Sequence, residues 1–403
     1  MSRFSVDCAS PAGAGVGCAA VGNLRASVAG AVVVAATGWS FGNIGPAADV
    51  LRDAYGTGLG MIGLLISAVV LTHTAMNIPA GRMVDAVGAP RIVLAGCAIL
   101  LLANVVAATS PSLALGIAMR CLAGVGTAMG FVAATDYVRV VTRSPFAQGI
   151  VGGAAFGGAG LSLAIVPLLD GLGWRAPYLS AAVVAVIAGA VFSAAPIRGS
   201  APARSGRRPA SLASLLNDRG LYRLGVVHVG SMGTSLVVGA WVVTLLTREG
   251  DLGTRASGLV GSLVLLLGLV TRPAGGWIRH RRPDRMRAVV QLSLAAVGLA
   301  TVALSLSPPL PLAILACSVV GIAAGLPFAV AFDAAAALRP EAPAAAVGLV
   351  NMLANLFVLV TAPIVGALFG LGWAGQAALA AIGALTALGA LIVPSRRGLG
   401  LAP

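Results

Sequence analysis

The chain consists of long apolar runs that carry almost no charge. Of its 403 residues, 58% are hydrophobic and only 9% are charged, whereas soluble domains carry about 25% charged residues. The apolar runs reach the roughly 20 residues that a helix needs to cross a bilayer. Because lipid offers the backbone no hydrogen-bond partner, we expect an all-α membrane protein.

Twelve of these runs are expected to cross the membrane as helices. They lie at 27–48, 58–80, 92–109, 112–135, 147–170, 175–195, 221–246, 256–278, 288–307, 310–332, 344–369 and 373–393.

Two short phrases occur twice, about half the chain apart. Pro-Ala-Gly stands at 79–81 and again at 273–275, and Gly-Leu-Gly-Trp stands at 171–174 and again at 370–373. An internally repeated membrane chain is typical of secondary transporters, whose substrate site lies between the repeats. The sequence therefore predicts two pseudo-symmetric bundles of six helices each.

A polar, arginine-rich break divides the two predicted bundles. It gives five segments, which are a disordered tail at 1–24, a bundle at 25–196, a cytoplasmic linker at 197–219, a second bundle at 220–395 and a C-terminal tail at 396–403. The simplest interpretation of 197–219 is a flexible connector whose charge sets the topology. The alternative is a regulatory or lipid-binding segment.

The charge is strongly basic, and its distribution points to a membrane rather than to nucleic acid. The formal net charge is +14, and every cation is arginine. Most of these arginines fall in tails and loops on one side, so the positive-inside rule places both termini in the cytoplasm. We expect a multi-pass protein of the cytoplasmic (inner) membrane of a bacterium. No nucleic-acid partner is expected, because the stacking aromatics of such modules are missing.

The loop between the second and third runs has a pattern that suits gating. Gly81 permits close approach of helices, Asp85 offers an acceptor to helix amides or an arginine, Gly88 turns the chain, and Arg91 begins the next helix. A carboxylate in so short a cytoplasmic loop can hold two bundles together on one side and release them in the other state.

This loop resembles the signature Gly-x-x-x-Asp-Arg-x-Gly-Arg-Arg of the major facilitator superfamily. Gly81, Asp85 and Gly88 match it, and Arg91 falls near a usual basic position, whereas Ala86 replaces the first arginine. The resemblance implies that Asp136, at the end of the fourth run, completes the charge relay. Its counterpart in the second half is Asp333.

Two further stretches resemble the same family. Arg120-Cys121-Leu122-Ala123-Gly124-Val125-Gly126 is similar to its Arg-x-x-x-Gly-x-Gly stretch, and Gly173-Trp174-Arg175-Ala176-Pro177-Tyr178 is similar to its Gly-Trp-Arg-x-x-aromatic opening of the sixth helix. The resemblance covers about residues 25–395. It implies the twelve-helix fold of that family and transport by alternating access.

Two arginines are expected at membrane depth, where a cation costs at least about 2.5–3.5 kcal/mol and is a functional candidate by default. Arg120 and Arg272 are therefore candidates for substrate binding. The alternative for Arg120 is that it caps backbone carbonyls. The alternative for Arg272 is that its side chain reaches the headgroups.

Arg272 also stands in a stretch, 269–276, that resembles the eighth helix of the nitrate/nitrite porter branch, in which such an arginine coordinates the anion. In that branch a second arginine lies on the second helix. Here Asn77 is interpreted as standing in its place. The resemblance implies an anionic or partly anionic substrate, and the missing second arginine counts against nitrate itself.

Other candidates are polar or aromatic residues on runs that are expected to line the cavity. The substrate-binding candidates are Trp39, Asn43, Trp241, Asn351 and Asn355, and the candidates for proton coupling are His73 and His228. Each has a structural alternative, since buried amides bridge helices and a lone histidine often serves as a hydrogen-bond partner.

The expected function is transport of a small solute, with no cofactor and no metal, by a monomer that binds a small molecule, the bilayer and a coupling proton. The main alternative is efflux of hydrophobic compounds by proton antiport on the same fold. A receptor without transport activity is a further alternative. A membrane enzyme is disfavoured, because the chain has no Ser/His/Asp grouping, no metal-ligand cluster and no P-loop lysine.

Overall fold

The computed structural model describes residues 15–143, 145–195, 215–250, 252–340 and 342–401, and the regular structure in these ranges is helical. The first half of the chain forms one bundle. Its helices are α1 (Gly15–Gly42), α2 (Ala48–Tyr55), α3 (Leu59–Val87), α4 (Ala89–Ala107), α5 (Leu113–Thr142), α6 (Pro145–Ile165) and α7 (Ala176–Ser193), with 3-10 turns η1 (Gly45–Ala47) and η2 (Val166–Arg175).

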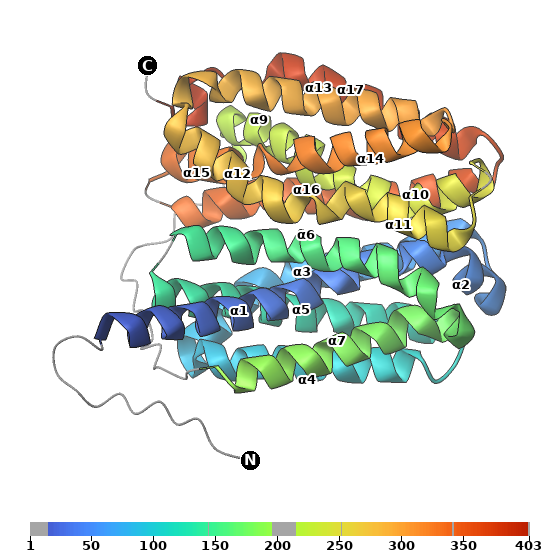
Figure 1. Cartoon of the computed structure of the whole chain (residues 1–403), viewed down its shortest axis with the longest axis horizontal. Helices are drawn as coiled ribbons and strands as arrows, with labels where there is room; N and C mark the ends of the chain where they lie inside the picture. The colour runs from blue at the N-terminus through green and yellow to red at the C-terminus, as the bar shows by residue number, and fades with distance from the viewer. Residues whose placement is uncertain (1–14, 144, 196–214, 251, 341, 402–403) are drawn as a thin grey trace.

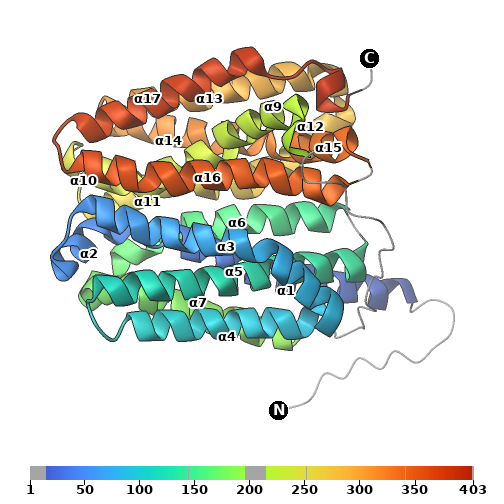
Figure 2. The same cartoon turned by 180° about the vertical axis from the view of Figure 1, so that it is seen from behind.

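The second half forms a matching bundle, which lies above the first in Figures 1 and 2. Its helices are α9 (Arg219–His228), α10 (Thr234–Arg248), α11 (Thr254–Leu266), α12 (Gly268–Arg281), α13 (Met286–Ser305), α14 (Leu310–Gly325), α15 (Phe328–Leu338), α16 (Pro343–Phe369) and α17 (Ala374–Gly389), with the π-helical turn η3 (Val229–Gly233) and short 3-10 turns η4 (Pro283–Arg285), η5 (Ala390–Ile392) and η6 (Arg397–Leu399).

Eleven candidate membrane spans are present among the described residues. One of them, Ala147–Ser193, has 47 residues and would be about 70 Å long as a single helix, which is roughly twice the thickness of a bilayer. Its backbone leaves helical geometry at Leu169 and Gly173, so α6 and α7 cross separately. The predicted twelve-helix architecture is therefore confirmed.

The repeated Gly-Leu-Gly-Trp phrase marks the same turn in both bundles. Gly173 has a φ of 55° and Gly372 a φ of 65°, which is the left-handed region that a side chain disfavours. Each glycine reverses the chain just before the last helix of its bundle, α7 or α17. The repeat thus reflects one backbone requirement that was duplicated with the bundle.

The two halves meet along two seams. α6 lies beside α11 and α12 in Figure 1, and α3 lies beside α16 in Figure 2. Glycines make both contacts close. A Cβ atom on Gly160 would lie 2.5 Å from the backbone of Leu266, and one on Gly63 would lie 2.5 Å from that of Pro363. Small residues of this kind let membrane helices approach at backbone distance.

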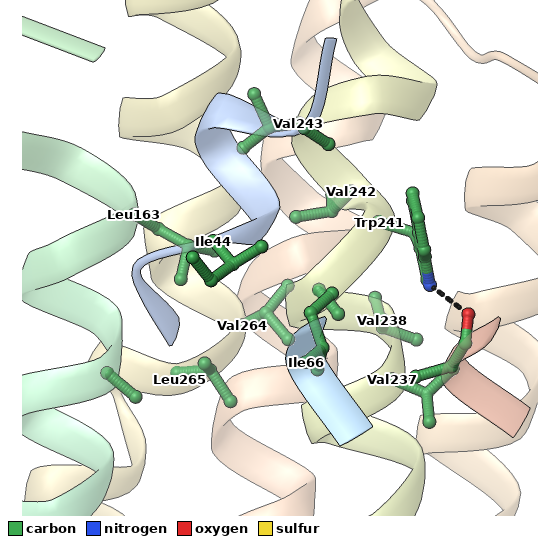
Figure 3. Close-up of a cluster of buried hydrophobic side chains, with 14 of the residues drawn as sticks. Ile44, Ile66, Leu163, Val237, Val238, Trp241, Val242, Val243, Val264 and Leu265 are labelled. Atoms are coloured by element: carbon green, nitrogen blue, oxygen red, sulfur yellow. Dashed lines mark hydrogen bonds between the residues drawn. The ribbon is translucent and has the colours of Figure 1, made fainter. Parts of the chain in front are cut away.

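The buried apolar clusters show at which end the halves are joined. We call the end of the molecule where α1 begins and α17 ends the terminal end (left in Figure 1), and the opposite end the α2 end. Toward the α2 end, one cluster contains residues of both halves, among them Ile44, Leu163, Trp241 and Val264 (Figure 3). Toward the terminal end, each half has its own cluster. The halves therefore share a core at the α2 end only.

The segment boundaries differ from prediction at both ends of the chain. α1 begins at Gly15, so residues 15–24 are helical rather than part of a disordered tail. The C-terminal segment is packed, because Leu399 and Leu401 are buried against the second bundle. Residues 1–14 and 196–214, which hold the rest of the predicted tail and most of the predicted linker, lie outside the described residues.

The close packing of α1 on α6 leads to a prediction about stability. A Cβ atom on Gly38 would lie 1.8 Å from the carbonyl oxygen of Ala155. We expect Gly38→Ala to lower the free energy of unfolding by about 1–3 kcal/mol through overpacking, measured as a lower melting temperature in detergent. The matched control is Gly149→Ala, because no atom lies within 4 Å of that Cβ position. A control that destabilises as much as Gly38→Ala would contradict this explanation.

Candidate substrate site

Arg120 is fully satisfied inside the first bundle. Its Nε donates to Leu65 O at 3.1 Å, its Nη1 to Asn43 Oδ1 at 3.3 Å and its Nη2 to Ser40 O at 2.6 Å. The side chain is buried, with 1% exposed. These contacts tie α5 to α1 and α3, and they favour the structural alternative, in which Arg120 caps backbone carbonyls.

Three other candidates also use their polar atoms within the protein. Asn43 Nδ2 donates to Pro177 O at 2.7 Å, and Trp39 Nε1 donates to Ser180 Oγ at 3.2 Å, so both connect α1 to α7. Trp241 Nε1 donates to Ala362 O at 3.1 Å, between α10 and α16 (Figure 3). All three lie toward the α2 end, where the halves share their core, and they form part of that packing.

Arg272 is different, because its guanidinium is buried with only part of it paired. Its carbon Cζ lies 3.5 Å from the ring centroid of Phe156 on α6 and 4.0 Å from that of Phe328 on α15. Nη1 donates to Gly152 O at 3.2 Å, across the seam between the halves. Nε and Nη2 are buried and have no hydrogen-bond partner. A buried group that lacks its partners is uncommon and calls for an explanation.

A second group of incompletely paired side chains lies against the same phenylalanine. The ring of His228 packs on Phe328 at 5.9 Å and on Phe332 at 4.7 Å between centroids. Its Nε2 contacts Asn351 Oδ1 at 3.4 Å, whereas its Nδ1 is buried without a partner. One turn further along α16, Asn355 Nδ2 is also buried without a partner. We call Arg272, His228, Asn351 and Asn355 the polar cluster.

The polar cluster lies close to the middle of the membrane. Arg272 and His228 are nine residues, and Asn351 is eight residues, from the terminal end of their helices, which is roughly 12–14 Å along the helix axis, compared with a ~30 Å hydrocarbon core. This is the depth at which secondary transporters of this architecture bind substrate.

The cluster also coincides with breaks in three helices of the second half. His228 ends α9 directly before the π-helical turn η3, Arg272 follows the break between α11 and α12, and Phe328 follows the break between α14 and α15. Interrupted helices commonly form binding sites in transporters, and π-turns are frequent at functional sites.

The remaining candidates of the first half lie on α3. His73 Nδ1 is 3.0 Å from Thr127 Oγ1, and its ring lies between Phe41 and Phe131. Asn77 is half-buried. The shared Pro-Ala-Gly phrase places Ile78, not Asn77, opposite Arg272 in the repeat, and Ile78 is 70% exposed. In this register the first half has no arginine opposite Arg272, and the role of Asn77 in substrate binding stays a prediction.

The predicted gating residues gather at the terminal end. Gly88 has a φ of 93° and separates α3 from α4, and Arg91 Nη1 donates to Val87 O at 3.5 Å. Asp136 pairs with Arg139 on its own helix, and its counterpart Asp333 pairs with Arg279 at 3.0 Å. Gly81 is partly exposed. Asp85 is exposed, and its carboxylate makes no ion pair with a described residue. Their roles in gating stay predictions.

Ion pairs connect the halves at the α2 end. Asp49 pairs with Arg248, and Asp170 pairs with Arg255 at 2.7 Å. Arg248 also donates to Phe369 O at 3.3 Å. At the terminal end, the ion pairs between described residues stay within one half. The electrostatic contacts and the apolar clusters therefore agree that the molecule is closed at the α2 end.

The sequence analysis did not identify the two phenylalanines that pack against Arg272. Phe156 and Phe328 enclose the guanidinium of Arg272, but a phenylalanine in an apolar run carries no signal of its own. The glycines at 230 and 233 do hint at the turn η3, since glycine weakens a regular helix. Within the described residues, no group of three or more His, Cys, Asp or Glu could hold a metal.

Two bundles of six helices, with a buried polar cluster in the second bundle whose Arg272 contacts the first, are the architecture of a secondary transporter. The sequence profile of the Major Facilitator Superfamily matches residues 30–362. The chain therefore belongs to this superfamily, whose members are membrane transporters and not enzymes. The resemblance to the nitrate/nitrite branch stays a prediction.

Solved and curated proteins agree at the level of the superfamily. A crystal structure of the nucleoside transporter NupG superposes with a TM-score of 0.73 at 14% identity, over 92% of this chain and 98% of that one, which supports the fold alone. The probable sulfoacetate transporter of Cupriavidus necator is 29% identical over 34% of this chain and 33% of its own length.

The names of two other relatives refer to amines and to drugs. Multidrug resistance protein D of Escherichia coli is 27% identical over 63% of this chain and 64% of its own length, and the human synaptic vesicular amine transporter is 26% identical over 54% and 45%. The matched regions thus span between about a third and just under two thirds of these curated relatives.

The contrast between the two buried arginines gives a prediction about stability. Arg120→Leu removes the donors to two carbonyls and an amide oxygen, so we expect it to cost roughly 2 kcal/mol or more. Arg272→Leu removes a partly unpaired cation. We therefore expect its free energy of unfolding to lie within about 1 kcal/mol of the original value or to exceed it. Melting temperatures in detergent measure both. Equal losses for the two variants would mean that Arg272 is as well satisfied as Arg120.

Proposed function

We propose that the protein carries a small organic anion across the cytoplasmic membrane by alternating access, with Arg272 as the residue that binds the anionic group. The observation that carries this proposal is the buried pair of unpartnered donors, Nε and Nη2 of Arg272. These two atoms form one edge of the planar guanidinium, and such an edge binds both oxygens of a carboxylate or two oxygens of a sulfonate.

The surroundings of Arg272 fit a site that opens and closes. Phe156 and Phe328 lie on either side of the guanidinium, and Phe156 comes from the opposite half. The bond from Nη1 to Gly152 O also crosses between halves. Separation of α6 from α12 would expose the cation to water, and an anion arriving there would pair with it. The relative named as a probable sulfoacetate transporter supports a small organic anion as the substrate.

The terminal end is proposed to face the cytoplasm. Basic residues gather there, in the loops after α3, α5 and α12, as the positive-inside rule requires. With the α2 end closed by a shared core and two ion pairs, the described conformation is then closed toward the outside, and the site of Arg272 is occluded by Phe156 and Phe328. In the outward-facing state, Asp85 would find the partner that it lacks here, which is the role that its loop signature implies.

The first experiment measures anion binding through stability. We expect small carboxylates and sulfonates to raise the melting temperature of the purified protein, since a ligand at about 100 times its Kd adds roughly 2.7 kcal/mol. The increase should vanish in Arg272→Ala and persist in Arg223→Ala, which removes an exposed arginine of α9. Uptake of the same anions into proteoliposomes should follow the same order. Stabilisation that survives in Arg272→Ala would overturn the proposed site.

A second candidate function is efflux of hydrophobic compounds. An apolar groove of about 410 Å³ lies between α9, η3 and α16 and is lined by residues such as Tyr222, Val226, Leu356 and Phe357. Multidrug resistance protein D is similar over nearly two thirds of the chain. Stabilisation by hydrophobic cations or neutral drugs, unaffected by Arg272→Ala, would favour this alternative over anion transport.

The ion pairs at the α2 end lead to a prediction about conformation. Asp49→Asn removes the contact to Arg248 between the halves, so we expect the α2 end to open more often. In a cysteine-free background, a cysteine placed at Val243, which is buried there, should then react several-fold faster with a membrane-impermeant maleimide. Asp53→Asn is the matched control, because the ion pair that Asp53 makes among the described residues is with Arg52 on the same helix. Equal rates in all three proteins would contradict a closing role for the pair.

A further inference from the structure

The polar cluster contains an unpartnered acceptor as well as unpartnered donors. Asn351 contacts His228 through Oδ1, an oxygen that can only accept, so Nε2 of the histidine carries the hydrogen of that contact. A neutral imidazole carries one hydrogen, so Nδ1 presents a lone pair. This lone pair is buried and has no partner. A ligand that satisfies it must supply a hydrogen-bond donor.

The donors that lack partners lie on two other residues of the polar cluster, Arg272 and Asn355. Arg272 and His228 pack against the same ring, that of Phe328. Asn355 lies four residues after Asn351 on α16, so the two amides share one face of the helix. Its Nδ2 is a buried donor without a partner. The cluster thus offers an edge of two donors on Arg272, one acceptor on His228 and one donor on Asn355.

A hydroxyl group matches the second pair, since it donates one hydrogen bond and accepts another. We infer that the substrate is a small hydroxy acid, a hydroxycarboxylate or hydroxysulfonate. Its anionic group binds Nε and Nη2 of Arg272, its hydroxyl donates to His228 Nδ1, and its hydroxyl oxygen accepts from Asn355 Nδ2. This inference rests on the proposed function and adds His228 and Asn355 as the residues that determine specificity.

The physical reason for selectivity is the cost of leaving His228 unpaired. An anion without a hydroxyl would fill the edge of Arg272 and bury the lone pair of Nδ1 with nothing to satisfy it. Sites built to bind a hydroxyl reject analogues that lack it far more strongly than apolar pockets reject a missing methylene. The rings of Phe156 and Phe328 pack against Arg272, and that of Phe332 packs against His228, so the groups that lack partners have apolar neighbours.

The test compares anions that differ only in the hydroxyl. Hydroxyacetate is paired with acetate, and 2-hydroxyethanesulfonate with ethanesulfonate, and binding to the purified full-length protein is measured by calorimetry. We expect each hydroxylated anion to bind roughly tenfold more tightly or better. In His228→Leu this ratio should fall to about one while the affinity for acetate is retained. In His228→Gln, whose amide oxygen restores an acceptor, part of the ratio should return.

The controls separate this inference from the proposed function. His280→Ala removes an exposed histidine of α12 and should leave the ratio unchanged. Equal affinities within each pair, abolished by Arg272→Ala, would overturn the hydroxy-acid inference and leave anion transport standing. A ratio that survives in both His228 variants would remove His228 from the site. Absence of binding by every anion would overturn the proposed function together with this inference.

Discussion

In a membrane, a buried polar group has to find its hydrogen-bond partners within the protein. The two halves of the molecule differ in how fully their buried arginines meet this requirement. Arg120 meets it in full, with a carbonyl or amide oxygen for each of its three nitrogens. Arg272 meets it through one nitrogen only. The first arginine holds α1, α3 and α5 together. The second keeps two buried donors unpaired, which is costly in hydrocarbon and is the basis of the proposed anion site.

The same asymmetry extends to the helices. In the first bundle, α3 and α6, which face the other half, are uninterrupted helices. In the second bundle, helices are interrupted at η3, at Leu267 and before Phe328. Each break releases backbone and side-chain groups from regular helix geometry near the middle of the membrane. The first bundle thus provides a regular surface, with Phe156 and Gly152 as its contacts, against which the broken helices of the second present their polar groups.

The α2 end is the more firmly closed of the two, because more side chains pair across the seams there. Ile44 and Trp241 belong to one apolar cluster at the α2 end, reinforced by the pairs that Arg248 and Arg255 make with carboxylates of the first bundle. The terminal end has two separate clusters and ion pairs confined to one half. Glycines along the seams keep the halves close while leaving few interlocking side chains, which suits rocking between two states.

The sequence by itself determined the membrane class, the twelve crossings and the duplication, because hydrophobic length and repeated turn residues such as Gly173 and Gly372 act locally. It also singled out Arg272, His228, Asn351 and Asn355, since a polar residue in an apolar run is visible from its neighbours alone. Which of the candidates stay unpaired was decided only by the tertiary structure. In the sequence, nothing distinguishes these four candidates from Arg120, Trp39, Asn43 and Trp241. In the structure, the partners of the latter are carbonyls, an amide and a hydroxyl on other helices. Pairing depends on contacts between residues far apart in the chain, and so the site emerged only once the helices were packed.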